Sequence, residues 1–168
     1  YTFASSEQAD SLPGFDFSHE LKEIFPTVED ALAVEPGRVK VMASCWSPPG
    51  WMKQNGSELG MYNNVKGTLK TSKYQAYANY ITKFIQNYES RGIDIYAITP
   101  NNEPDHASYD WPALPMSHTQ AQTLVADYLR PTLTQNGIDA KILCWDHSYT
   151  TTNYREGSYP LEFYEDAD

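Results

Sequence analysis

The stretch Ile93-Asp94-Ile95-Tyr96-Ala97-Ile98-Thr99 decides the fold class of this 168-residue chain. It is short, apolar and rich in β-branched residues, and Arg91-Gly92 stands before it as a helix stop signal, so the pattern predicts a β-strand. Two similar stretches, residues 39–45 and 141–145, lie on either side of it in the chain. The sequence therefore predicts three strands of one buried, parallel sheet.

Helical periodicity fills the intervals between these strands. Apolar residues recur at helical spacing over residues 74–88, and Arg91-Gly92 is expected to close that helix. Ser117-His118-Thr119-Gln120 has the form of a capping box, which opens a second helix, and Asn136-Gly137 is the corresponding stop signal. Strands that alternate with helices predict an α/β protein.

The remaining segments are predicted with less regular structure. Residues 1–26 are expected to be a loop, followed by a short helix over residues 28–34 with Thr27 as its N-cap. Residues 46–72 form a long Gly- and Pro-rich connection, and loops of that length are usually functional. A short helix is expected over residues 160–168.

The charge balance restricts the classes of molecule that the protein is expected to bind. With 12 basic and 22 acidic residues the net charge is -10, which argues against nucleic acid or an anionic membrane as a partner. No apolar run approaches the roughly 18 residues of a membrane span. Neutral sugars remain possible, and 14% aromatic residues suit them. Cys45 and Cys144 are interpreted as two thiols in apolar strands in preference to a disulfide.

The number of strands limits the architecture. Three strands, each followed by a long loop and a helix, belong to a segment of a (β/α) barrel or to a doubly wound sheet. A closed barrel needs eight strands and typically about 250 residues, so we expect this chain to be part of one. The chain also starts at Tyr1 and not at Met, which is expected of a processed chain or a fragment. A flavodoxin-like domain is the alternative, although no Gly-rich phosphate loop supports it.

Polar residues follow each predicted strand. Trp46-Ser47-Pro48 comes after the first strand, Asn102-Glu103 after the second, and Asp146-His147 after the third. In (β/α) barrels the active site lies at this C-terminal rim. Pro104 stiffens the turn and biases Glu103 away from helical geometry. Glu103 is therefore the best candidate for a catalytic carboxylate.

Several motifs together resemble one enzyme family. Asn102-Glu103-Pro104 looks like the fourth-strand motif of retaining (β/α)8 glycosidases. Residues 43–53, Ala-Ser-Cys-Trp-Ser-Pro-Pro-Gly-Trp-Met-Lys, are more specific. With Tyr1-Thr2-Phe3-Ala4 and Trp145-Asp146-His147 they resemble glycoside hydrolase family 30, over about residues 1–165. The resemblance implies a partial (β/α)8 TIM barrel, about strands 3 to 5 with their helices, and residues 1–168 would be a fragment of a single catalytic domain.

The resemblance also implies roles for individual residues. Glu103 would be the general acid/base, and Asn102 would contact the sugar 2-hydroxyl, where hydrogen bonds strengthen in the transition state. Trp46 would wall the subsite of the cleaved sugar, and Trp111 would stand at the cleft. His147 and Asp146 just before it would bind the sugar, although Asp146 could equally bond the backbone or orient His147. Trp51 is interpreted as structural.

Other implications concern the whole enzyme. The family supplies its nucleophile from the seventh strand, outside this chain, so the fragment alone is expected to be inactive. The parent would be a secreted, retaining β-glycoside hydrolase, closest to the endo-β-1,6-glucanases, that acts on a β-linked glucan or glucoside, and the rest of the barrel would be the fragment's structural partner. The alternatives are a glucosylceramidase or β-xylosidase-like specificity, or a fragment that binds glycan without cleaving it.

Neither a cofactor nor a metal is expected. Asp105-His106 and Asp146-His147 could in principle gather around a metal with Glu103. Their spacing matches no ligand signature, and glycosidases of the kind this chain resembles need no metal.

Overall fold

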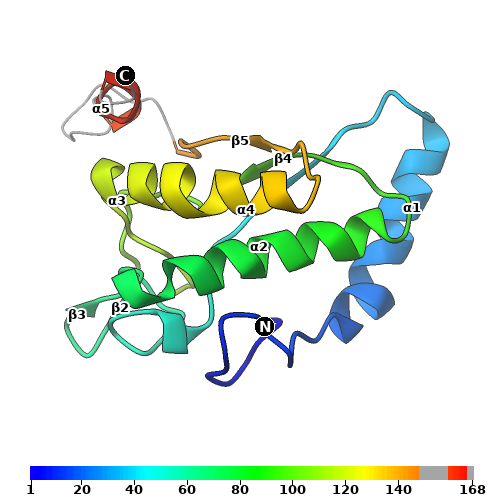
Figure 1. Cartoon of the computed structure of the whole chain (residues 1–168). Helices are drawn as coiled ribbons and strands as arrows, with labels where there is room; N and C mark the ends of the chain where they lie inside the picture. The colour runs from blue at the N-terminus through cyan, green and yellow to red at the C-terminus, as the bar shows by residue number, and fades with distance from the viewer. Residues whose placement is uncertain (148–158, 166–168) are drawn as a thin grey trace.

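A three-stranded parallel sheet organises the structure. The computed structural model describes residues 1–147 and 159–165 (Figure 1). Its strands are β1 (Val41–Ser44), β4 (Ile95–Thr99) and β5 (Lys141–Ile142), in the order β1-β4-β5. The three predicted strands are confirmed, with β4 in the centre. β5 is shorter than the sequence indicates, because only Lys141 and Ile142 pair with β4.

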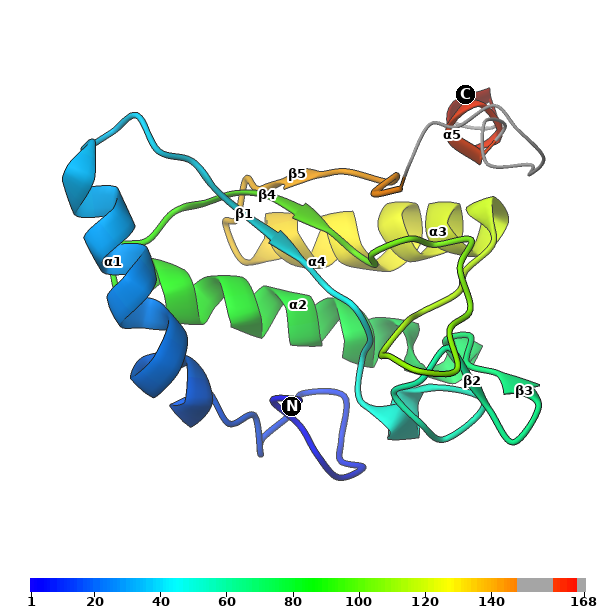
Figure 2. The same cartoon turned by 180° about the vertical axis from the view of Figure 1, so that it is seen from behind.

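Two long helices cover one face of this sheet. α2 (Tyr74–Glu89) lies beside a second helix made of α3 (His118–Thr123), η4 (Leu124–Leu129) and α4 (Arg130–Gln135), and both views place the two on the same side of the strands (Figures 1 and 2). Apolar side chains from helices and strands form the core between them, among them Ile81, Ile85, Ile95, Ile98, Leu129 and Leu133. This is the packing that a βα repeat requires.

The second long helix changes character along its length. Ser117 and Gln120 form the predicted capping box, with the Ser117 Oγ accepting from the Gln120 amide at 3.2 Å. The middle segment, η4, is π-helical, which widens the turn and shifts the phase of the side chains beyond it. α3 packs against α5 (Tyr159–Glu165), whereas η4 and α4 pack against α2. The helix ends at Asn136-Gly137 as predicted, with Gly137 at φ 71°.

The N-terminal segment contradicts part of the sequence prediction: the helix expected over residues 28–34 is present, but it begins earlier. The chain is already helical from Ser18, and η1 (Glu20–Ile24) continues into α1 (Phe25–Val34), so residues 1–26 are not all loop and Thr27 is not an N-cap. Pro26 stands at the junction of η1 and α1, in the first turn of α1. Glu20 fixes this turn, since its buried carboxylate accepts hydrogen bonds from the hydroxyls of Tyr1 and Tyr88.

The connection over residues 46–72 is more ordered than a loop. It contains the short helices η2 (Gly50–Met52) and η3 (Thr71–Lys73) and a hairpin of β2 (Met61–Tyr62) and β3 (Val65–Lys66). Asn63 and Asn64, at φ 48° and 60°, form the hairpin turn, and Asn is one of the few residues that accept these angles.

Two further expectations concern the whole chain. Cys45 and Cys144 are both free thiols, as interpreted from the sequence. Among the helices of residues 1–147 and 159–165, none is long and apolar enough to cross a bilayer.

Candidate active site

The polar residues that follow the three strands meet at one end of the sheet. The amide of Cys45 donates to the carbonyl oxygen of Thr99 at 3.3 Å, and the amide of Asn102 donates to the carbonyl of Cys45 at 2.7 Å. On the other side the amide of Glu103 donates to the carbonyl of Asp146 at 2.9 Å. The ends of β1, β4 and β5 are thus tied together around the Asn102-Glu103 dipeptide, which confirms the predicted clustering.

Glu103 has an unusual backbone. Its φ is 44°, in the left-handed region that costs an L-residue about 1–2 kcal/mol. Pro104 follows it, and the amide of His106 closes the turn on the Glu103 carbonyl at 2.9 Å. Strained backbone of this kind concentrates at functional sites, where the surroundings hold it in place. The side chain is 39% exposed and so accessible to a substrate.

His147 lies beside this carboxylate. Its Nε2 is 4.0 Å from Glu103 Oε1, and its side chain is only 12% exposed. The ring also packs against that of Trp145, with centroids 5.4 Å apart. The structure therefore brings two of the sequence-predicted site residues together at the rim.

Exposed aromatic rings flank the same end of the sheet. Trp46 is 49% exposed and Trp111 44%. Trp111 stacks on His106, with centroids 5.4 Å apart and an interplanar angle of 11°. Flat rings held in this way offer stacking surfaces to a sugar. Trp51 is different, since its Nε1 donates to the Ala4 carbonyl at 2.8 Å, which supports the structural interpretation.

Three side chains from the three strand ends form a polar network beneath this rim. The Ser44 hydroxyl donates to Asp146 Oδ2 at 2.7 Å. Thr99 Oγ1 lies 2.6 Å from Ser44 Oγ and 3.1 Å from the same Asp146 oxygen. Sequence reasoning missed Ser44 and Thr99, because a hydroxyl at a strand end gives no signal until the register is known.

Metal ligation has no geometric support in the part of the chain that the structure describes. There, no group of three or more His, Cys, Asp and Glu side chains stands close enough to hold an ion.

Comparison with known proteins identifies the family. The model of the glycosyl hydrolase family 30 TIM-barrel domain matches residues 1–153. The chain belongs to glycosyl hydrolase family 30. Its three parallel strands and their helices are accordingly part of a TIM barrel, and the doubly wound alternative is excluded.

Relatives of this family 30 chain include enzymes of two specificities. Endo-1,6-beta-D-glucanase neg1 of Aspergillus fumigatus is 31% identical over 153 residues, which are 86% of this chain and 31% of that protein. The lysosomal acid glucosylceramidase of Mus musculus is 28% identical over 150 residues, 87% of this chain and 29% of that protein. The solved structure of the endo-beta1,6-glucanase BT3312 matches with a TM-score of 0.83 and 32% identity, over 99% of this chain and 37% of that one. This chain thus spans about a third of the length of these relatives.

A buried lysine joins two loops at the rim of this family 30 domain, the loop after β1 and the loop after β4, which are called the two rim loops below. Lys53 is fully buried, and its Nζ lies 2.7 Å from the Ala113 carbonyl oxygen in the loop that carries Trp111. In its own loop Nζ contacts the carbonyls of Glu58 and Leu59 at 2.7 and 2.8 Å, and Ser47 Oγ at 3.0 Å. Burial lowers the pKa of Lys53 to about 7.

Backbone contacts support the same junction. The amide of Met61 donates to the Ser108 carbonyl at 2.7 Å, and the amide of Ala113 to that of Glu58 at 3.1 Å. Gly60 lets the chains approach, since a Cβ there would lie 2.5 Å from the Ser108 nitrogen. The loop after β1 and the loop after β4 therefore form one unit that supports Trp111.

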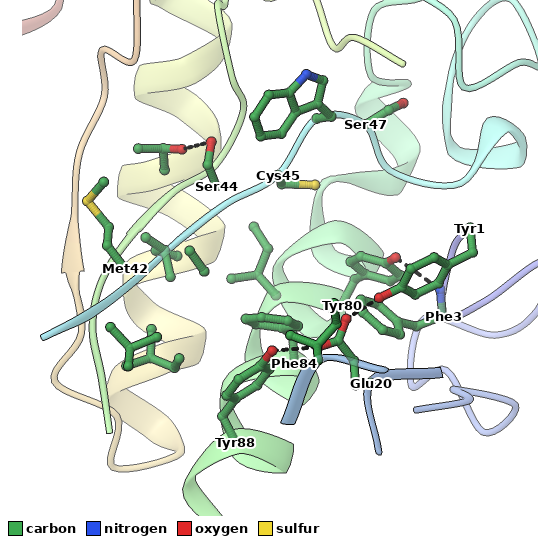
Figure 3. Close-up of a pocket in the computed structure, with 18 of the residues that line it drawn as sticks. Tyr1, Phe3, Glu20, Met42, Ser44, Cys45, Ser47, Tyr80, Phe84 and Tyr88 are labelled. Atoms are coloured by element: carbon green, nitrogen blue, oxygen red, sulfur yellow. Dashed lines mark hydrogen bonds between the residues drawn. The ribbon is translucent and has the colours of Figure 1, made fainter. Parts of the chain in front are cut away.

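An apolar pocket of about 560 Å³ lies beside β1 (Figure 3). Tyr80, Phe84 and Tyr88 of α2 line it, and they face Tyr1 and Glu20 of the N-terminal segment. Met42 and Ser44 of β1 line the pocket as well. Glu103 does not line this pocket, so the candidate site is the rim and not this cavity.

Proposed function

We propose that the protein is a retaining β-glycoside hydrolase in which Glu103 is the general acid/base. One observation carries the proposal: Glu103 stands partly exposed beyond the end of the central strand with a strained backbone, and the Asn102-Glu103 dipeptide is hydrogen-bonded to residues that follow both neighbouring strands. In such a mechanism the carboxyl group first protonates the departing glycosidic oxygen and then, as a carboxylate, takes a proton from the attacking water. The nucleophile would be a second carboxylate, about 5 Å away, from outside this chain.

The neighbouring residues would hold the sugar. Asn102 precedes Glu103, and its backbone amide donates to the Cys45 carbonyl. Its position is thereby fixed, which suits a hydrogen bond from its side chain to the sugar 2-hydroxyl. Trp46 and Trp111 would wall the subsites on either side of the scissile bond. His147, beside Glu103, would contribute a polar contact near the same sugar.

The substrate follows from the relatives. We assign a β-linked glucan, with endo-β-1,6-glucanase-like specificity, because relatives at 31% and 32% identity carry that activity in their names. The enzyme would be secreted, and residues 1–168 would be one piece of a single catalytic barrel whose other strands cover β1 and β5. A glucosylceramidase-like specificity is the second candidate, favoured by the relative at 28% identity.

The deciding experiment is Glu103→Gln in the enzyme that carries this chain together with the rest of its barrel. Loss of general acid catalysis costs about 10²–10⁴-fold in the first, glycosylation step, where the loss should be severe for a sugar leaving group and small for an activated phenolate, which needs no protonation. The second step has lost its general base, so overall turnover of the activated substrate should still be slow. Azide should partly restore turnover of the activated substrate and yield a β-configured product. Glu89→Gln, an exposed carboxylate at the end of α2, is the matched control. Equal loss on both substrates without azide rescue would refute the acid/base role.

Two comparisons test the remaining alternatives. Turnover of β-1,6-glucan, glucosylceramide and aryl β-xyloside by the whole enzyme separates the three specificities. Binding of glucan by the whole protein with no turnover of any of them would favour a glycan-binding role. The 168-residue chain alone should hydrolyse none of these substrates, because it lacks half of the catalytic pair.

A further inference from the structure

The network of Ser44, Thr99 and Asp146 has a geometry that the proposed chemistry does not itself require. Its three members come from three different strands or strand ends, and Thr99 is buried at 3% exposure. Asp146 Oδ2 is the common acceptor, and hydrogen bonds to a charged oxygen are roughly twice as strong as neutral ones. The Asp146 carboxylate is therefore the group that holds the network together.

Asp146 depends on this network for its position. The ladder between β4 and β5 ends at Ile142, well before Asp146, and beyond it the Leu143 amide donates to the Ile98 carbonyl. No strand pairing holds residue 146 itself. Its side chain, tied to Thr99 and Ser44, sets where its backbone lies relative to the end of β4.

The backbone of Asp146 in turn holds Glu103. Its carbonyl oxygen accepts the Glu103 amide at 2.9 Å, on one side of the Asn102-Glu103 dipeptide. On the other side the carbonyl of Cys45, the residue after Ser44, accepts the Asn102 amide at 2.7 Å. Both carbonyls that hold the dipeptide therefore belong to residues of the network or next to it.

Such a hold is needed because Glu103 is strained. A left-handed φ on a glutamate persists only where the surroundings over-determine it. If the Asp146 carbonyl shifts, the peptide can relax and carry the carboxyl group away from the glycosidic oxygen. A misplacement of about 1 Å can cost about 10²-fold in rate.

We propose that the Ser44–Thr99–Asp146 network is the device that positions the acid/base Glu103, with Asp146 as a positioning residue that acts through its backbone carbonyl. This inference rests on the proposed function of Glu103. It gives Asp146 a role other than the sugar contact that the family resemblance implies.

The test uses Asp146→Asn in the whole enzyme, assayed on the same two leaving groups as Glu103→Gln. The amide keeps the shape but removes the charge that both hydroxyls share. The kcat/KM should fall by about 10- to 100-fold on the sugar leaving group and by less than about 3-fold on the activated phenolate, with KM unchanged. The Glu103 amide should also exchange its hydrogen faster than in the unmodified enzyme, while amides of α2 keep their rates.

Two variants of Thr99 distinguish loss of the network from misfolding. Thr99→Val should reproduce the leaving-group dependence, and Thr99→Ser, which restores the hydroxyl, should return most of the activity. A variant that merely loosens the sheet would not recover in this way. These two variants decide the question if Asp146→Asn does not fold.

The outcomes separate the two proposals. If Glu103→Gln shows leaving-group dependence and Asp146→Asn loses activity equally on both substrates with a raised KM, Asp146 contacts sugar and the positioning role is wrong. If Glu103→Gln itself shows no such dependence, the acid/base assignment and the inference built on it both fail.

Discussion

Replacing Lys53 by Met tests how the two rim loops are held together. Met keeps most of the aliphatic stem and removes the ammonium group, whose Nζ contacts four oxygen atoms at 2.7–3.0 Å. Hydrogen bonds to a charged group contribute about 1.5–3 kcal/mol each, so a simple sum over four bonds would be about 6–12 kcal/mol. The structure predicts a much smaller loss.

The reason lies in the other donors around Lys53. Without the ammonium group, the Glu58 carbonyl still accepts the Ala113 amide and the Leu59 carbonyl still accepts Asn55 Nδ2. The buried carbonyl of Ala113 is the group that loses its donor, which costs about 1–3 kcal/mol. Removal of a buried charge offsets part of this. We therefore expect a net loss of about 1–3 kcal/mol, localised at the junction of the two loops.

Native-state hydrogen exchange measures this loss where it should occur. The amides of Met61 and Ala113 bridge the two loops, and their opening free energy should fall by about 1–3 kcal/mol in Lys53→Met, with amides of α2 unaffected. Lys70→Met is the matched control, because Lys70 Nζ reaches the single carbonyl of Trp51 and should cost less than about 1 kcal/mol. A loss of more than about 4 kcal/mol that extends into α2, or no change at Met61 and Ala113, would refute this reasoning.

Three further predictions concern stability. Gly60→Ala should destabilise the protein by about 1–3 kcal/mol in chemical denaturation, because the new Cβ would meet backbone of Ser108. Gly14→Ala, whose nearest neighbour is the flexible side chain of Gln8, should change stability by less than about 0.5 kcal/mol. Ser117→Ala removes one side of the capping box and should cost about 0.5–2 kcal/mol by the same measurement. Because the pKa of Lys53 is about 7 in the folded protein and near 10.5 when unfolded, the unfolded state binds more protons between these values; the free energy of unfolding should therefore rise with pH across that window, and Lys53→Met should lack that contribution to the rise. An identical pH slope in both proteins would contradict the lowered pKa.

The alternating elements could be predicted because each leaves a local signal. The apolar runs of β1 and β4, the periodicity of α2 and the capping box at Ser117 all act within a few residues of sequence. The early part of the N-terminal helix, residues 18–27, was missed because it carries Pro26 and a buried Glu20, which local sequence rules assign to loops, whereas its later part, residues 28–34, was predicted. Glu20 is accommodated only by Tyr1 and Tyr88, which are distant in sequence.

The residues of the rim also differ in whether the sequence reveals them. Glu103 could be singled out because an apolar strand, an Asn and a Pro mark it in the sequence. Lys53 gave no such signal, since three of its four acceptors are backbone carbonyls, one of them in a second loop. Ser44 and Thr99 look like ordinary strand residues until the pairing of β1 with β4 sets them opposite each other. Neither the positive φ of Glu103 nor the stacking of His106 on Trp111 follows from local propensity.

The π-helical segment Leu124–Leu129 sets a limit on how this helix tolerates changes of length. Each α-helical residue turns the chain by about 100°, so a wider turn lets the two ends of one helix face different neighbours. If the same six residues formed a regular α-helix, the added rotation would turn Leu133 out of the core that it shares with the sheet, whereas loss of a single residue here would restore the α-helix with Leu133 still in place. Homologous sequences that lack one residue within residues 124–129 should therefore form a regular α-helix there, whereas gaps elsewhere in this helix should be rare.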